Sequence, residues 1–548
     1  MGSLVCKYLS VVGRGSSGRW SDFARCASIS WLWVVGAISR ELQTRCDDTL
    51  LWQHNAAPEA SADNSAHAVK TASGEPSTPI DVGPDSDDSE HLPNLSQHVQ
   101  TYMLGNGPRD FWDRVDPADP KLVCLEDRLR AKGDWRSKAI PYAIHGDGAV
   151  FTQKDSNSML TVSIKSLLSQ RFKLCILPIF SIAKAARAAG QDDAVGILWS
   201  FVAHFLNAAF EGIHPVADPY GGDWAHGPLA QVAGEPFLDD RFFFVLWSIT
   251  GDLEYLSNEL RFPHFNSNSP CWFDQCGRSE GCPHPMTDVS LNASWKDTQV
   301  SAAEGCMVPI SEHPIFSIIG ANRWMAPGDL MHSGDLGVCS YVSGSVLEEL
   351  CDEAPGPCTE SGKVWQVWLA IRSGYETART TNRVNRLERS MFSRRDDFPC
   401  FKGKAGETRS LLFILRDICR QWSDGSDWHD HRCRCLDSLC AMYSVLMNAS
   451  LFPTKDESRD ALMLYDNFLL HHNWLLKRSL THNKRRYGFY FKFHHCWHIV
   501  HQSQWLNPCH TWCYEFEDFM SQVVAAGRAC VAGSPMEIIG NKVLHNFC

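Results

Sequence analysis

Runs and alternations of apolar residues divide the chain into a strand-rich part and a mostly helical part. Residues 139–150 (AIPYAIHGDGAV) are largely apolar and predict a buried strand, and residues 159–168 (MLTVSIKSLL) alternate in part, which predicts a second strand after a turn. Residues 241–250 (RFFFVLWSIT) form a continuous apolar run, typical of a strand covered on both faces. Helical spacing predicts helices over 179–210 and 253–260. This order of elements predicts an α/β fold.

The segment from residue 285 to residue 470 has mostly helical spacing with irregular connections. Amphipathic helices are predicted over 343–350, 364–371, 410–419 and 436–451. A last helix is predicted to begin near Tyr514. We therefore expect a large helical insertion between two parts of an α/β core.

Composition adds to this division of the chain. The 548 residues, 44% of them hydrophobic, are enough for two to four domains at roughly 100–200 residues each. The net charge of −12 is concentrated in residues 56–100, where eight acidic residues and one lysine give −7. That segment is rich in Ser, Pro, Asp and Ala, which predicts an acidic disordered linker. We expect an uncertain N-terminal segment (1–55), the linker (56–116), a first core part (117–284), the insertion (285–470) and a second core part (471–548).

Cysteine usage and hydropathy indicate the compartment. The chain has 22 cysteines, no recognisable secretion signal and no run of the ~20 apolar residues that a membrane span needs. We therefore expect a soluble intracellular protein without a membrane partner, in which most cysteines are reduced core thiols and a few are metal ligands.

Two aspartates lie at the ends of predicted strands. Asp147 lies between two glycines, which fits either a turn or an uncrowded carboxylate that meets a ligand. Asp252 follows the longest apolar run, where an acid is either the N-cap of the next helix or a site residue at the end of a strand. Both alternatives remain open for each residue.

Further candidate groups lie downstream. Cys271 and Cys276, with Cys282 and His284 nearby, are either zinc ligands or buried thiols, and their spacing favours thiols. Asp329 and His332 either cap a helix or lie together on one helical face, three residues apart. Glu517 falls outside the apolar stripe of the last predicted helix, which leaves it available to a site.

Positive charge is concentrated near the C-terminal end. Between residues 467 and 514 there are six basic residues and no acidic one, interleaved with aromatic residues. This composition fits a phosphate-binding track with aromatic platforms for base stacking, or else a solvated helix surface over an aromatic core. The basic residues are Lys477, Arg478, Lys484, Arg485, Arg486 and Lys492.

Taken in order, these motifs resemble a known family. The segments that carry the resemblance are IPYAIHGDGAV, ITGDLEYLSNELRFPHFNSNSPCWFDQC, DLMHSGDLGVCSYVSGSVLEEL and KFHHCWHIVHQSQWLNPCHTWCYEFEDFMSQV, within roughly residues 135–548. They resemble the CACTA-like DDE transposases and relatives such as the Plavaka and Kyakuja elements. The two cysteines are spaced CxxxxC, whereas CxxC is usual in that family.

The resemblance implies a fold, a site and an activity. It implies an RNase H-like mixed sheet with a helical insertion, and a triad of Asp147, Asp252 and Glu517, with Asp329 competing with Asp252 for the second place and His332 beside it. It implies two Mg²⁺ or Mn²⁺ ions for DNA cutting and joining, with Zn²⁺ at Cys271 and Cys276 as an additional possibility. A nuclear DNA-binding protein, in monomeric or homo-oligomeric form, is the expected context.

Two other classes of function fit the same residues. One is a transposon-derived DNA-binding protein that keeps the fold without the reaction. The other is an unrelated α/β protein in which these acids are caps and turns. The decisive observation is whether Asp147 and Asp252 lie on neighbouring strands, because only the transposase-like arrangement requires their carboxylates to meet.

Overall fold

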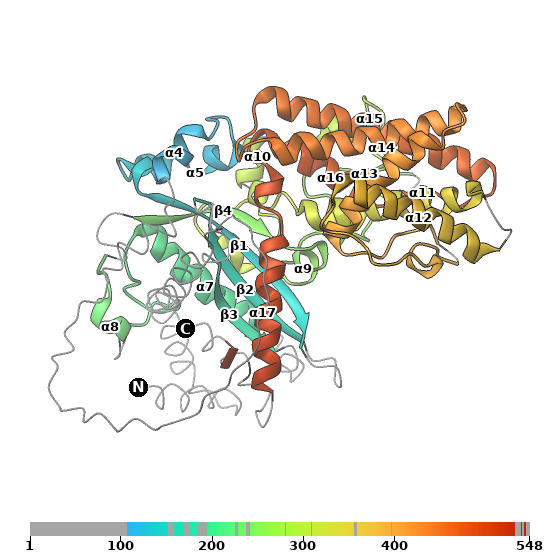
Figure 1. The fold of residues 1–548 in the computed structure, drawn as a ribbon. Coiled ribbons are helices and arrows are strands. Elements are labelled where there is room, and N and C mark those ends of the chain that lie inside the picture. The colour runs from blue at the N-terminus through green and yellow to red at the C-terminus, as the bar shows by residue number, and fades with distance from the viewer. Residues whose placement is uncertain are drawn as a thin grey trace, which may run out of the picture.

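The computed structural model describes most of the chain beyond residue 106. Figure 1 shows a small sheet on one side and a large group of helices on the other. The protein is thus a mixed α/β protein that is mostly helical. The described residues are 107–151, 158–168, 176–183, 194–224, 228–236, 242–279, 281–307, 309–355, 359–395, 397–531, 539 and 542–543. Segment 1–55 and most of the expected acidic linker lie outside them.

Four strands make one mixed sheet in the order β3-β2-β1-β4. β1 pairs antiparallel with β2 and parallel with β4, and β2 pairs antiparallel with β3. Strands β1, β2 and β4 confirm the predicted strand positions, because their apolar residues are buried. The strands are β1 (Ala139–Val150), β2 (Ser158–Ser166), β3 (Ile176–Ala183) and β4 (Phe243–Thr250).

Two predictions about this half of the chain are wrong. Of the helix expected over 179–210, residues 179–183 belong instead to strand β3, whereas residues 194–210 are helical in α7 (Ala194–Glu211) and residues 184–193 lie outside the described residues. The linker expected to extend to residue 116 ends earlier, because α4 (Pro108–Arg114) is a helix. Phe111 and Trp112 anchor that helix: both are buried, and the Trp112 ring meets the ring of Trp247 on β4 edge to face, with centroids 4.9 Å apart.

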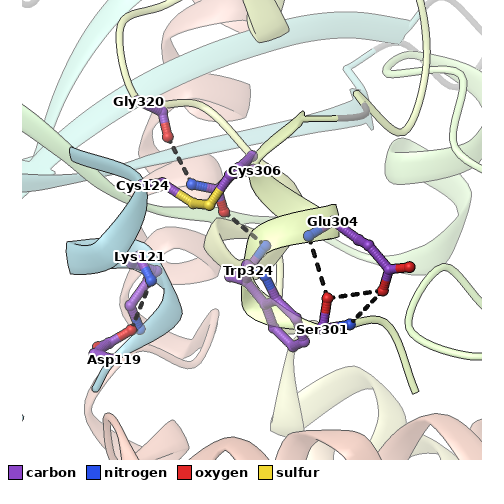
Figure 2. The surroundings of a disulfide bond; sticks show 9 residues. Asp119, Lys121, Cys124, Ser301, Glu304, Cys306, Gly320 and Trp324 are labelled. Atoms are coloured by element: carbon purple, nitrogen blue, oxygen red, sulfur yellow. Dashed lines mark hydrogen bonds and ion pairs between the residues drawn. A yellow bond between two sulfur atoms is a disulfide. The ribbon is translucent and has the colours of Figure 1, made fainter.

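Two of the smaller helices are joined covalently. A disulfide between Cys124 and Cys306 connects α5 (Pro120–Arg130) to α10 (Ala302–Met307), with the Cα atoms 5.4 Å apart (Figure 2). Within the described part of the chain, the other cysteines are free thiols and most are buried, which agrees with the expectation for the majority. The remaining short helices here are α8 (Pro228–Val232) and α9 (Leu253–Asn258).

The helical half confirms the predicted amphipathic segments. The longest helices, α14 and α15, lie side by side (Figure 1). α15 runs through residue 470, so the helical part continues beyond the boundary that the sequence suggested. The helices are α11 (Ser340–Glu353), α12 (Glu360–Ala378), α13 (Ala405–Gln421), α14 (Asp427–Asn448), α15 (Lys455–Thr481) and α16 (Phe491–His501), preceded by a π-helical segment, Met331–Cys339.

The chain then returns to the sheet. Helix α17 (Tyr514–Cys530) runs across the strands (Figure 1) and packs on β1. Its predicted apolar stripe is buried, and the ring of Phe516 stacks on His145 of β1 with centroids 4.4 Å apart. The fold therefore brings residues near 145, near 252 and near 517 to one edge of the sheet.

Candidate functional site

The parallel pairing of β1 and β4 places two acids at the same edge. The last paired residues are His145 and Thr250, so Asp147 and Asp252 each lie two positions beyond the same pair. The carboxyl ends of parallel strands are a common place for ligand sites, because the following loops open there. Asp252 follows β4, as the sequence predicted, whereas Asp147 lies within β1 opposite Thr161 of β2 and not in a turn.

Asp252 also caps a helix. Its Oδ1 accepts a hydrogen bond from the backbone N–H of Tyr255 at 2.6 Å, which starts α9. The cap holds the Tyr255 ring over the two strand ends, where a Cβ at Gly146 would lie 2.0 Å from the ring and a Cβ at Gly251 would lie 2.5 Å from it. The N-cap alternative for Asp252 is therefore confirmed, and its charge also acts on nearby Asp147.

Helix α17 supplies the third acid. Glu515 and Glu517 both lie in its first turn, but they face different partners. Glu515 pairs with the buried Lys165 of β2, Oε2 to Nζ 2.6 Å, whereas Glu517 points to His332, with Oε1 3.6 Å from Nε2. Glu517 is thus the α17 acid beside the strand-end carboxylates.

Asp329 and His332 form the pair that their spacing suggested. Asp329 Oδ2 lies 2.7 Å from Nδ1 of His332 and also accepts that residue's backbone N–H at 2.8 Å. Its other oxygen, Oδ1, accepts the backbone N–H of Cys513 at 2.8 Å. Asp329 is therefore buried with both oxygens engaged, and it orients the His332 ring so that Nε2 points to Glu517.

Several acidic side chains lie close together at the end of the sheet that carries Asp147 and Asp252. Burial, followed by the charges of Glu517 and Asp252, raises the pKa of Asp147 from 3.8 to about 7. Burial also raises the pKa of Glu517, and the negative charges of Asp329 and Asp252 act in the same direction. Although burial opposes it, the bond to Asp329 raises the pKa of His332. A bound cation would favour the ionised form of all three acids.

The predicted nucleic-acid residues divide into three groups. Lys477, Arg478, Lys484 and Arg485 are exposed at the end of α15 and in the loop after it. Arg486 is half-buried and pairs with Asp352, Nη2 to Oδ2 2.6 Å. Lys492 lies beside the carboxylates instead, and its Nζ donates to the backbone oxygen of His332 at 3.0 Å.

The interleaved aromatic residues are mainly core. The rings of Tyr487, Phe491 and Trp497 are buried, so they are not platforms for base stacking. The solvated surface over an aromatic core, which the sequence left open, is the better description of this stretch.

A second cluster lies between the loop after α9 and helix α16. Cys271, Asp274, His494 and His498 are all buried, and their potential ligand atoms lie within 4.8 Å of one another. Cys276 is buried beside them and shares a hydrogen bond with the Cys271 thiol. Sequence reasoning found the two cysteines but missed Asp274 and the histidines, although their i, i+4 spacing on a helix was visible.

Hydrogen bonds within this second cluster control its charges. Burial opposes ionisation of Asp274, but hydrogen bonds from His494 and His498 lower its pKa. Burial likewise opposes protonation of His494, but the bond to Asp274 raises its pKa to about 9. The described chain thus contains buried Cys, Asp and His side chains that can hold a metal ion.

Comparison with known proteins adds no assignment. No protein-family model matches the chain, and no curated protein is significantly similar to it. Among the described residues, no helix combines the length and the apolar character needed to cross a membrane.

Proposed function

We propose that the protein cuts and joins DNA by metal-dependent phosphoryl transfer at Asp147, Asp252 and Glu517. The observation that carries the proposal is that Asp147 of β1, Asp252 at the start of α9 and Glu517 of α17 lie near one another at one end of the sheet, close enough for the charges of Glu517 and Asp252 to act on Asp147. Their mutual interaction is expressed in the raised pKa of Asp147. The strand order β3-β2-β1-β4, in which Asp147 lies in β1 and Asp252 follows the neighbouring strand β4, supports an RNase H-like core.

Each acid has a separate part in the proposal. Asp147, Asp252 and Glu517 are the oxygen ligands for two Mg²⁺ or Mn²⁺ ions, hard cations that prefer carboxylates. Such ions, when bound, activate the attacking oxygen and stabilise the leaving oxygen of an in-line transfer. Asp329 is a positioning residue and not the second catalytic acid, because both of its oxygens accept hydrogen bonds.

His332 and Lys492 complete the site. His332 presents Nε2 toward Glu517 and can hold a proton there, since Asp329 favours its charged form. Lys492 lies near Asp252 and Asp329, and its positive charge offsets part of the repulsion between the acids. The exposed basic residues at the end of α15 are the proposed contacts with the DNA backbone.

The two metal chemistries are assigned to different places. The carboxylates suit magnesium or manganese, whereas the thiol and imidazole ligands around Cys271 suit zinc. We therefore propose that a zinc ion at the cluster around Cys271 takes no part in the transfer reaction.

Nicking of a labelled DNA duplex by the full-length protein tests the proposal. Wild-type protein with Mg²⁺ or Mn²⁺ is expected to nick, and each neutral variant is expected to lose at least about 100-fold in rate, as removal of a metal ligand or an oriented group does. The variants are Asp147→Asn, Asp252→Asn and Glu517→Gln, and the matched control is Asp518→Asn, an exposed acid one residue along α17. Nicking that persists in all three variants would exclude this site. Salt-sensitive DNA binding without nicking by the wild type would favour a non-catalytic DNA-binding protein instead.

A further inference from the structure

The second cluster joins two segments that are far apart in the sequence. Cys271 and Asp274 lie in the loop that follows α9, and His494 and His498 lie one helical turn apart on α16. All four side chains are almost fully buried, with exposures between 1% and 7%. A buried polar or charged side chain normally has a hydrogen-bonding or ionic partner. Four such side chains whose polar atoms lie at one point are more than simple pairing requires.

The distances between their atoms fit a common ligand. The Nε2 atoms of His494 and His498 are 3.2 Å apart, and the Cys271 Sγ is 3.5 Å from Nε2 of His498. A tetrahedral zinc with Zn–N of about 2.05 Å and Zn–S of about 2.3 Å separates two nitrogens by about 3.3 Å and a nitrogen from a sulfur by about 3.5 Å. The observed separations are those that a zinc ion would impose.

Asp274 is the fourth potential ligand of the cluster. Its Oδ2 lies 3.0 Å from Nε2 of His494 and 2.9 Å from Nε2 of His498. These values are somewhat shorter than the oxygen–nitrogen separation of about 3.3 Å in a tetrahedral zinc site. Hydrogen bonding alone accounts poorly for the cluster, because two imidazole nitrogens converge on a single carboxylate oxygen while the Cys271 thiol lies beside one of them.

We propose that Cys271, Asp274, His494 and His498 bind one Zn²⁺ ion in a closed, structural site. Four protein ligands fill a tetrahedral shell and leave no open position, which is the pattern of structural zinc. Cys276 lies against Cys271 as a neighbouring thiol and not as a ligand. The inference is independent of the proposed transfer reaction.

The position of the site suggests what the ion stabilises. The zinc ion joins α16 to the loop after α9. These two elements also border the carboxylates of the proposed reaction centre. α16 carries Lys492 and packs against the π-helical segment that contains His332, while Asp252 begins α9. Zinc at this point holds the two elements in a fixed relation without touching the three acids.

Metal content and cobalt substitution test the site in the full chain. Protein purified without added metal is expected to contain about one zinc per chain by elemental analysis. Cys271→Ser and His498→Asn are expected to lose it. Cys276→Ser and Cys496→Ser, the latter a buried thiol on the same helix, are expected to keep it.

Cobalt is the second measurement because a variant that fails to fold would also lose zinc. Wild-type protein stripped of zinc and loaded with Co²⁺ is expected to show the intense visible bands of tetrahedral cobalt and a thiolate charge-transfer band. Wild-type protein that contains no zinc and gives no such spectrum overturns the site. Loss of zinc in Cys276→Ser but not in Asp274→Asn overturns Asp274 as the fourth ligand. Unchanged zinc content in Asp147→Asn separates this site from the proposed reaction centre.

Discussion

Asp147 is the acid at the sheet edge whose protonation responds most to its neighbours. Burial and the charges of Glu517 and Asp252 raise its pKa from 3.8 to about 7, so between those pH values the folded chain holds a proton that the unfolded chain has lost. The proton that the folded chain holds on Asp147 contributes its full stabilisation of the folded state below pH 4. This stabilisation is lost as the pH rises through 7, because Asp147 then has to ionise in the folded state. The rise corresponds to at most about 4 kcal/mol.

We expect Asp147→Asn to remove this pH dependence. Without Mg²⁺ or Mn²⁺, the variant should match the wild type near pH 4 and exceed its free energy of unfolding by up to about 4 kcal/mol at pH 8, measured by urea unfolding. Added Mg²⁺ should stabilise the wild type at pH 8 and leave the variant unchanged, since a bound cation favours the ionised acid. A difference between the two proteins that is constant with pH would contradict this account of Asp147.

Gly146 is the residue on which the packing of Tyr255 depends. A Cβ there would lie 2.0 Å from the ring of Tyr255, whose backbone N–H is already fixed by Asp252. We expect Gly146→Ala to lower the free energy of unfolding by about 1–3 kcal/mol, the usual cost of overpacking. Gly281→Ala is the control, since a Cβ there meets nothing within 4 Å. Partial recovery in the double variant Gly146→Ala/Tyr255→Leu would show that the clash is with this ring.

At the scale of elements, the first turn of α17 carries one acid that pairs with a buried lysine and one acid of the proposed site. Glu515 neutralises Lys165, whose side chain is 1% exposed, whereas Glu517 faces His332. We expect Glu515→Gln to lower the free energy of unfolding by about 3 kcal/mol, because it leaves a buried ammonium without its carboxylate. Glu517→Gln should change stability by less than about 1 kcal/mol but abolish metal-dependent nicking. The reverse pattern in the two assays would mean that the roles of these glutamates are exchanged.

The same scale shows what sequence patterns can and cannot locate. The run in β4 is apolar at nearly every position, so it predicted a covered strand, and Asp252 followed from its end. β3 was missed because IFSIA is followed at once by the helix-forming KAARAA, and only pairing with β2 makes it a strand. The spacing of His494 and His498 alone does not indicate a metal site, because Cys271, which lies beside them in the fold, is more than 200 residues earlier in the sequence.

At the scale of the whole molecule, three long-range closures bring the halves of the chain together: the return of α17 to the sheet, the cluster between Cys271 and α16, and the disulfide. None of them was accessible from local patterns, because periodicity reports which face of an element is buried and not which distant element covers it. The order of motifs along the chain, by contrast, predicted that Asp147, Asp252 and Glu517 lie in one region, and the charges of the other two acids do act on Asp147. The parallel pairing of β1 and β4 places Asp147 and Asp252 at the same level of the sheet.

The disulfide is the long-range connection whose effect on stability can be measured most directly. Cys124 and Cys306 are separated by 182 residues, and a cross-link over so long a loop removes much of the conformational freedom of the unfolded chain. The loop-entropy relation gives a stabilisation of at most about 5 kcal/mol. We expect dithiothreitol to lower the urea midpoint of wild-type protein and to have no such effect on Cys124→Ser/Cys306→Ser, whose midpoint should equal that of the reduced wild type. Because the bond joins α5 to α10 and contacts none of the three acids, metal-dependent nicking should continue in both proteins below their midpoints. Equal midpoints for wild-type protein with and without reductant would show that the two thiols stay reduced, and that packing alone holds α5 against α10.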